Sequence, residues 1–230
     1  MYRIVLFFLP FLTFSQSNFE KGESLFHQKK YDEANVYFEA HLKAKPSDYK
    51  TIEYLGDIAG YHKKWDEAMV KYKVLKEKFP NNANYHYKYG GAMGMKAKES
   101  SKFKALGMID EIETSFKTAA KLDAKHTDTR WALLILYLEL PGILGGSEKK
   151  AQKYADELMT ISKIDGVMAK GHIEEYFKRY TKAESYYLQG VNLTHSKTAY
   201  LRLINLYKKM ELPKKVKAIE EESYKYNKDS

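Results

Sequence analysis

His172 and Glu175 have the residue types and the spacing that could support metal chemistry. On a helix they would lie one turn apart, where an imidazole and a carboxylate can share one ion. Zinc takes three or four ligands, however, and neither a second histidine nor another carboxylate is paired with these two. The sequence therefore favours a solvated histidine over a metal ligand, and we expect no metal site.

Motifs of known catalytic machinery are missing from the sequence. It contains no Gly-x-Ser-x-Gly, no His-Glu-x-x-His and no dinucleotide-binding loop. It also has no cysteine, which excludes disulfides, thiolate nucleophiles and zinc–thiolate sites. We expect a protein that is not an enzyme and that uses no cofactor.

A glycine-rich segment, Pro141-Gly142-Ile143-Leu144-Gly145-Gly146-Ser147, precedes a helix expected over 148–162. Helix N-termini can bind phosphate, but no Gly-Lys-Ser/Thr follows here, and Glu148 would repel an anion. Ser147 is a good N-cap. The segment is therefore interpreted as a plain helix–helix connection.

The charge of the chain is strongly positive but is carried by lysine. The net charge is +9 and 39 residues are basic, of which only Arg3, Arg130, Arg179 and Arg202 are arginine. Proteins that read nucleic acids depend on arginine, because its planar fork pairs with phosphate and guanine. We expect no nucleic-acid binding, and the lysines leave open a weak attraction to acidic partners or anionic membrane surfaces.

Residues 1–15 differ from the rest of the chain. Arg3 is the only charge, and an apolar run of 11 residues follows from Ile4 to Phe14. That run is too short to span a membrane, which takes roughly 20 residues. An early charge, a short apolar core and small residues before a cut near Ser15 favour a signal peptide over a buried N-terminal helix. We expect an exported protein, periplasmic or secreted, with one domain over 16–230 and no transmembrane span in the mature chain.

The remainder of the sequence repeats with an offset of 34 residues. Lys29-Lys30-Tyr31-Asp32-Glu33-Ala34 returns as Lys63-Lys64-Trp65-Asp66-Glu67-Ala68. The same offset links Gly22, Gly56 and Gly90. A period of this size is typical of stacked helical hairpins. Gly22 and Gly56 would let two helices touch, with Ala34 and Ala68 facing them, while Phe38 and Tyr72 fill the gap between hairpins.

The pattern predicts the individual helices and one irregular region. Helices are expected over 18–29, 32–45, 48–62, 66–78, 148–162, 167–178, 181–194, 197–210 and 213–227, with a fifth helix capped by Asn81-Asn82 and another starting at 126–128. In the third repeat a turn is expected over 96–102, followed by one long helix to about Leu122 with Phe116 as its aromatic landmark. Glycines 90, 91, 94 and 107 indicate close helix packing, or a pocket lined by Met93, Met95 and Met108. Packing is favoured, because methionines usually fill core gaps.

At these positions the chain resembles the tetratricopeptide repeat (TPR) family. The matching residues are Gly22, Ala34, Phe38, Pro46, Leu55, Gly56, Trp65, Ala68, Tyr72 and Pro80, and later Gly171, Tyr180, Ala183, Tyr187 and Gly190. The resemblance implies an all-α solenoid of about six antiparallel helix pairs, irregular in the third and fourth repeats. The Pro-Gly-x-x-Gly-Gly-Ser insert resembles a subset of exported bacterial TPR proteins and the T component of some TRAP-type transporters.

In TPR arrays the first helix of each pair lines the concave wall, so the resemblance implies where a partner would bind. The partner-binding residues expected on that wall are Glu53, Tyr54, Asp57, Tyr61, Tyr87, Lys88, His172, Glu175 and Tyr176. Family members that clamp a C-terminal carboxylate use lysine and asparagine there, whereas this chain has Glu53 and Asp57. Such a groove would suit a basic or extended polar peptide.

Two functions follow from these expectations. The first is a non-enzymatic scaffold of the bacterial cell envelope that binds a partner protein or peptide in its concave groove. The alternative is an accessory subunit of an envelope transport system, similar to the T component, with a small-ligand pocket near the third and fourth repeats. No residue cluster in the sequence identifies the partner.

Overall fold

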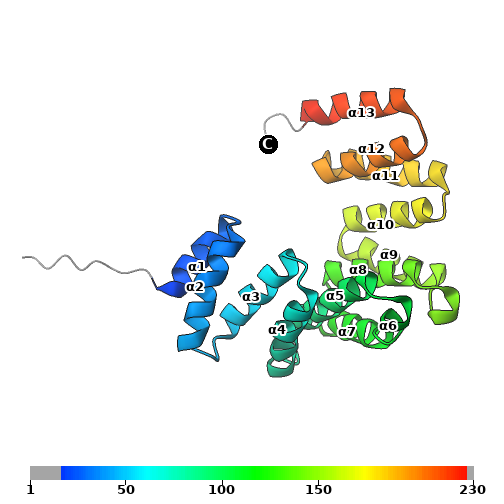
Figure 1. Ribbon diagram of the computed structural model, residues 1–230. Helices are drawn as coiled ribbons and strands as arrows, with labels where there is room; N and C mark the ends of the chain where they lie inside the picture. The colour runs from blue at the N-terminus through cyan, green and yellow to red at the C-terminus, as the bar shows by residue number, and fades with distance from the viewer. Residues whose placement is uncertain (1–16, 227–230) are drawn as a thin grey trace, which may run out of the picture. The chain divides into compact units, whose positions relative to one another are not determined.

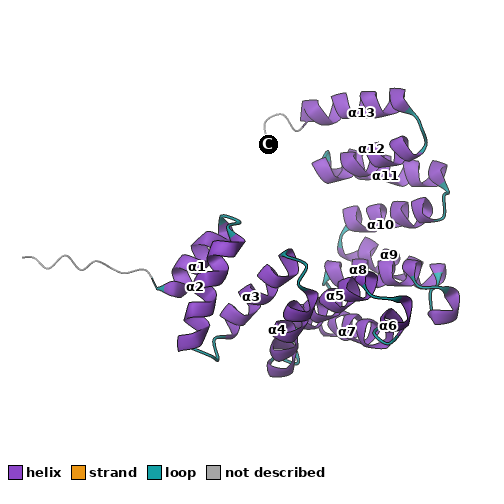
Figure 2. Ribbon diagram, viewed as in Figure 1, coloured by secondary structure: helices purple, strands orange, loops and turns teal. Residues whose placement is uncertain are grey.

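The computed structural model describes residues 17–226, and the predicted signal peptide over 1–15 lies outside them. The described part contains thirteen α-helices, one 3-10 turn and no strand. Figure 2 shows helices joined by short loops throughout. None of the described helices is both long and apolar enough to cross a bilayer. The predicted all-α solenoid of antiparallel helix pairs is confirmed.

The chain divides into two compact units at Leu75, within α4. The first unit contains α1 (Asn18–His27), α2 (Tyr31–Ala44), α3 (Tyr49–Tyr61) and most of α4 (Trp65–Lys78). Its core is built around Phe38, Leu55 and Ile58. The turns inside the two hairpins pass through Lys29 and Lys63, which both have positive φ, so the repeated lysine pair marks the same tight turn twice.

The second unit contains the remaining helices and begins at Lys76. They are α5 (Ala83–Glu99), α6 (Lys102–Leu106), α7 (Ile109–Leu122), α8 (Thr127–Glu139), η1 (Gly142–Leu144), α9 (Glu148–Ile161), α10 (Lys163–Tyr176), α11 (Tyr180–Thr194), α12 (Lys197–Lys209) and α13 (Pro213–Tyr226). Figure 1 shows the hairpins α8/α9, α10/α11 and α12/α13 stacked in chain order. Helix α8 contacts α5, α7, α9 and α10, as its apolar sequence indicates.

Each repeat glycine lies under an aromatic ring from the second helix of its hairpin. A Cβ on Gly22 would come within 2.9 Å of the Phe38 ring, and one on Gly56 within 2.7 Å of the Tyr72 ring. Gly90 meets Phe116 at 3.1 Å in the same way, which confirms Phe116 as the delayed landmark of the third repeat. The nearest neighbour of Gly22 and of Gly56 is thus the aromatic ring and not the alanine four residues before it, while at Gly90 the Cβ of Ser115 is as close as the ring, at 3.0 Å. The Phe38 ring lies over Gly22 inside its hairpin and also packs against Leu55 and Ile58 of the next hairpin, so it fills the gap between hairpins as predicted.

The irregular third repeat differs from its prediction in two respects. Helix α5 continues to Glu99, and the expected long helix is divided into α6 and α7 at Gly107 and Met108. The Ser100 hydroxyl donates to the carbonyl of Lys96 at 2.8 Å, which competes with the helix and helps to end α5. Close packing was the right prediction for Gly90 but wrong for Gly91 and Gly94, because a Cβ on either would meet nothing within 4 Å.

Helix α10 begins at Lys163, four residues before its predicted start. Ser162 ends α9 and also caps α10, since its hydroxyl accepts the backbone N–H of Asp165 at 3.3 Å. No loop separates the two helices, and Gly166, which reads as a loop residue in sequence, is buried inside α10. The connection over 141–147 forms the predicted link, with Ser147 capping α9 and Gly145 at φ +92°.

Candidate functional site

Tyrosine hydroxyls donate to carboxylates on neighbouring helices throughout both units. In the first unit Tyr54 bonds to Glu23 at 2.8 Å, and Tyr72 to Asp57 at 2.7 Å. In the second unit the same bond joins Tyr89 to Glu111, Tyr137 to Glu113, Tyr187 to Glu175, Tyr207 to Glu184 and Tyr200 to Glu222. Six of these seven tyrosines are buried, and Tyr54 is half-buried. The pairs therefore fix neighbouring helices to one another.

Lysines complete several of these pairs. Glu23 also accepts from Lys50 at 2.7 Å, and Glu184 accepts from Lys215 at 2.6 Å. The hydrogen bond from Lys50, then that from Tyr54, lowers the pKa of Glu23. Burial, together with Glu23, raises the pKa of Tyr54 to about 12. At neutral pH such pairs hold an ionised carboxylate and a neutral phenol, which is a structural arrangement and a poor one for proton transfer.

Removing one of these hydroxyls should weaken the fold measurably. Tyr187 is fully buried, so Tyr187→Phe leaves Glu175 with one donor fewer in a half-buried position, and we expect a loss of about 1.5 kcal/mol. The matched control is Tyr176→Phe, one residue after Glu175 but exposed, which should change stability by less than about 0.5 kcal/mol. Urea unfolding followed by circular dichroism measures both. Equal effects would show that the hydroxyl–carboxylate bond contributes nothing.

Four predicted partner-binding residues lie on α3 in the first unit. Tyr54 is stacked against Phe38 with ring centroids 4.7 Å apart, and Asp57 accepts from Tyr72. Tyr61 is largely exposed and lies 4.2 Å from the ring of Tyr31. Glu53 is half-buried. Tyr54 and Asp57 thus have structural contacts already, and Tyr61 offers the most open surface of the four.

The other predicted residues lie on first helices of the second unit. Tyr87 on α5 contacts the ring of His126 at 5.1 Å, and Lys88 follows it, half-buried. His172, Glu175 and the exposed Tyr176 all lie on α10. Helices α5, α8 and α10 contact one another in succession, and we call the surface that these first helices form the first-helix face. Helix α12 joins it through a bond from Lys209 to Glu175.

Two residues of the first-helix face that the sequence did not assign to a site complete a row with His172. Trp131 on α8 lies with its ring 6.4 Å from the His172 ring, and its indole N–H donates to Asp165 at 2.9 Å. Arg202 on α12 is exposed, and its charge acts on His172. Trp131 was hidden in an apolar run that reads as core, and Arg202 in a lysine-rich background. The only signal for either was the rarity of tryptophan and arginine in this chain.

His172 should make the fold less stable as the pH falls. Burial first, and then the charge of Arg202, lowers the pKa of His172, whose buried Nδ1 has no hydrogen-bond partner among residues 17–226. The unfolded chain takes up this proton near pH 6.5, whereas the folded chain resists it to a lower pH. The stabilisation is therefore complete above about pH 6.5 and is lost as the pH falls through the lowered pKa of the folded state.

The comparison of wild type with His172→Gln tests this pH dependence. Urea unfolding between about pH 7.5 and 5.5 avoids the range in which unfolded carboxyl groups titrate. We expect the free energy of unfolding to fall more steeply with decreasing pH in the wild type than in the variant. Parallel pH profiles would contradict the assignment to His172.

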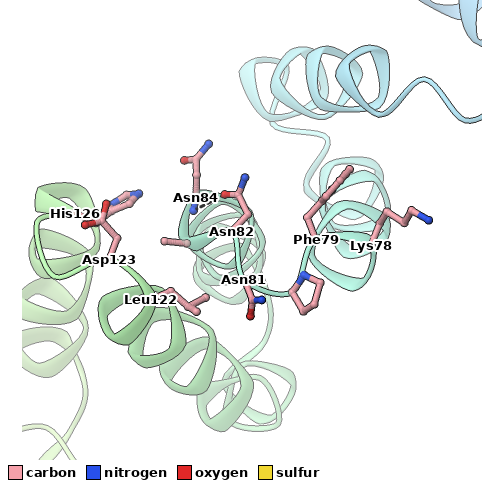
Figure 3. Close-up of a pocket in the computed structure, with 10 residues that line it drawn as sticks. Lys78, Phe79, Asn81, Asn82, Asn84, Leu122, Asp123 and His126 are labelled. Atoms are coloured by element: carbon pink, nitrogen blue, oxygen red, sulfur yellow. Dashed lines mark hydrogen bonds between the residues drawn. The ribbon is translucent and has the colours of Figure 1, made fainter.

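A cleft of about 670 Å³ lies where the third hairpin meets the start of the fourth. Figure 3 shows Asn81, Asn82 and Asn84 between Lys78 and Phe79 on one side and Leu122, Asp123 and His126 on the other. Asn82 and His126 are N-caps of α5 and α8, so part of this polar surface serves the helix ends. The cleft is lined by asparagines, and none of Met93, Met95 and Met108 lines it. Met93 is buried in the core.

Solved structures similar to this one are TPR proteins. A thermophilic TPR protein from Thermus thermophilus matches with a TM-score of 0.67 and 16% identity, over 82% of this chain and 96% of its own. A TPR protein from Parabacteroides merdae matches with a TM-score of 0.63 and 15% identity, over 90% and 78%. PilW, described as a widely conserved type IV pilus biogenesis factor, matches with 0.64 and 14%, over 93% of each chain. No protein-family model matches the chain, and no curated protein matches its sequence.

The chain has the TPR fold. Its six TPR hairpins are α1/α2, α3/α4, α5/α7, α8/α9, α10/α11 and α12/α13, with α6 and η1 as additions to the third and fourth. In TPR terms the first-helix face of the second unit is built by α5, α8, α10 and α12. The described residues contain no group of three or more histidines and carboxylates that could hold a metal ion.

Proposed function

We propose that the protein is a non-enzymatic scaffold of the bacterial cell envelope that binds a partner protein or peptide on its first-helix face. The observation that carries the proposal is the row of Trp131, His172 and Arg202 on three successive first helices of the second unit. These side chains combine partly accessible aromatic surface with an exposed guanidinium. Tryptophan and arginine are the residues most enriched at binding hot spots.

The chemistry of the face also supports binding rather than catalysis. Its carboxylate Glu175 is held by Lys209 and Tyr187. Burial acts to raise the pKa of Glu175, but these two hydrogen bonds lower it, so the group stays ionised at neutral pH. The partner is expected to be an extended polypeptide with acidic or polar groups near Arg202, which keeps the extended polar peptide expected from the sequence and replaces its basic alternative.

A photo-crosslinking amino acid placed on the first-helix face tests the proposal. We expect the Arg202 position to give a discrete protein adduct in the native cell envelope. Gln189, exposed on the second helix α11, is the matched control and should give none. An Arg202→Glu variant should weaken binding of the captured partner about tenfold or more. Equal adducts from both positions, or none from either, would contradict the proposal.

The envelope location is tested separately. Mass spectrometry of the protein recovered from cells should give a mature N-terminus near Gln16. A chain that retains Met1 to Ser15 would contradict the proposed envelope location, but not the proposed binding on the first-helix face. PilW, as a pilus biogenesis factor, is one TPR-fold protein with a role in assembly.

The accessory-subunit alternative has one observation in its favour. The asparagine-lined cleft lies near the third and fourth hairpins, where a small-ligand pocket was expected. Amide groups could orient a small polar molecule by hydrogen bonds. Native mass spectrometry of the protein from its own host should then show a bound small molecule that disappears in Asn81→Ala/Asn84→Ala. A ligand-free mass in the wild type would count against this function.

A further inference from the structure

Helix α6 and the 3-10 turn η1, the two additions to the TPR repeat, begin at neighbouring points of the second unit. Lys98, near the end of α5, forms an ion pair of 2.9 Å with Glu139, the last residue of α8. Helix α6 begins four residues after Lys98, and the 3-10 turn η1 begins three residues after Glu139. Figure 1 shows α6 and the end of α8 in the same part of the second unit. Insertions in repeat proteins commonly lie on one face, and that face often binds.

Each addition carries an apolar side chain into solvent. Phe103 on α6 is 86% exposed and Ile143 on η1 is 94% exposed, and no other large apolar side chain within residues 17–226 is as accessible. Leu106 and Leu144 lie beside them and are also exposed. We call these four residues the apolar tips. Single exposed apolar side chains are common, but the two most exposed ones within residues 17–226 both lie on additions to the repeat, which indicates a binding surface.

The turn that presents Ile143 is held in place by hydrogen bonds. The N–H groups of Leu144 and Gly146 both donate to the carbonyl of Pro141, at 2.8 and 3.1 Å. The N–H of Ser147 donates to Tyr137 at 2.9 Å, and the Lys150 ammonium donates to the carbonyl of Gly145 at 3.2 Å. These hydrogen bonds therefore hold the Ile143 side chain in its exposed position, and its exposure is a feature of an ordered turn.

The segment that carries Phe103 is positively charged, whereas the charges next to η1 balance, with Glu139 and Glu148 against Lys149 and Lys150. Residues 96–107 contain one carboxylate, Glu99, and four lysines: Lys96, Lys98, Lys102 and Lys104. Lys102 and Lys104 directly flank Phe103, and both are exposed. Lysine stems can lie along apolar surface while the ammonium groups contact phosphate. An apolar side chain flanked by lysines, as Phe103 is, matches the boundary between the headgroups and the acyl chains of an anionic bilayer.

We propose that the apolar tips, with Lys102 and Lys104, dock the second unit on an anionic membrane surface. Phe103 and Ile143 enter the headgroup layer, and the lysines bind lipid phosphates. A bilayer suits this surface better than a protein pocket does, because two separate protruding side chains need no complementary shape there. This docking goes beyond the proposed scaffold and does not depend on the identity of its partner.

Vesicle sedimentation with the full chain tests the docking. We expect binding to phosphatidylcholine vesicles that contain about 30% phosphatidylglycerol, and much weaker binding without the anionic lipid. Phe103→Ser/Ile143→Ser should lower the partition coefficient about tenfold or more. Lys102→Gln and Lys104→Gln should each lower it about fivefold on anionic vesicles only. The matched control is Val36→Ser, an exposed apolar residue of α2 whose replacement should leave the partition coefficient unchanged.

The absence of cysteine allows a second measurement of depth. An environment-sensitive fluorophore on Leu106→Cys or Leu144→Cys should shift to the blue on vesicles and be quenched by spin-labelled lipid. The same fluorophore on Leu201→Cys, on α12, should not respond. Three results would overturn the proposal. The first is an unchanged partition coefficient of Phe103→Ser/Ile143→Ser, which would result if residues 1–15 alone bound the vesicles. The others are a lack of quenching at positions 106 and 144, and dimerisation through the apolar tips without vesicle binding.

Discussion

Replacing Arg130 with methionine is expected to destabilise the fold by about 3 kcal/mol, because a buried guanidinium that serves several acceptors is removed. Arg130 is only 5% exposed. Its guanidinium donates to the backbone carbonyls of Ala120 at 3.0 Å, Asp123 at 2.6 Å and His126 at 3.3 Å. It also donates to the carboxylate of Glu157 at 3.3 Å.

These contacts explain the size of the effect. The last carbonyls of a helix such as α7 have no partner within the helix. Arg130 from α8 donates to two carbonyls at that end, those of Ala120 and Asp123. Methionine keeps the apolar packing of the arginine stem but ends about where Nε lies and has no donor. The carbonyls and the carboxylate would then lose their partners in a partly buried place, and the junction of α7, α8 and α9 would weaken.

Lys153→Met is the matched control for Arg130→Met. Lys153 pairs with the same carboxylate of Glu157, at 3.7 Å, but its side chain is 68% exposed. Exposed ion pairs contribute less than about 1 kcal/mol, so this variant should be close to wild type in urea unfolding. Equal stability of the two variants would contradict the structural role given to Arg130.

Gly166→Ala is expected to cost about 3 kcal/mol or more, because the new Cβ would overlap backbone that cannot rotate away. A Cβ at this position would lie 2.3 Å from the Cα of Met159 and 2.5 Å from its nitrogen. The backbones of α9 and α10 are in close contact here, one turn after the junction at Ser162. Relief requires the two helices to separate, which would disturb the core beneath Val167 and Ala169.

Gly94→Ala is the same substitution, but it is expected to raise the free energy of unfolding, whereas Gly166→Ala lowers it. Nothing lies within 4 Å of a Cβ on Gly94, in the middle of α5. Alanine should therefore stabilise the helix by up to about 1 kcal/mol through its higher propensity. Thermal and urea unfolding of both variants provide the comparison. Destabilisation of similar size at the two positions would contradict the packing described for α9 and α10.

The sequence predicted the fold well where the period of 34 is intact. Gly22 and Gly56 were predicted as points of close helix contact, which is confirmed, although the rings of Phe38 and Tyr72 lie over them where Ala34 and Ala68 were expected. The capping residues Asn82 and Ser147 were also predicted, because cap chemistry is local. Failures occurred where tertiary contact overrides local preference: Gly166 reads as a loop residue, but it is a helical residue selected by the approach of Met159.

The candidate site was less predictable from sequence. The resemblance placed Tyr87, His172 and Glu175 on first helices, where the structure has them. It could not show that Asp57 and Glu175 already accept from Tyr72 and Tyr187, because those bonds join residues 15 and 12 positions apart on different helices. Trp131 and Arg202 were not assigned, since an apolar run and a basic surface conceal single side chains whose role depends on the neighbouring helix.

A double-mutant cycle between Gly56 and Tyr72 tests most directly the hairpin register on which every surface assignment depends. Gly56→Ala, Tyr72→Leu and the double variant are compared by urea unfolding. The Tyr72 ring lies over Gly56, so Gly56→Ala should be destabilising alone and nearly harmless in the Tyr72→Leu background, with a coupling of about 2 kcal/mol. Additive effects, within about 0.5 kcal/mol, would contradict the register.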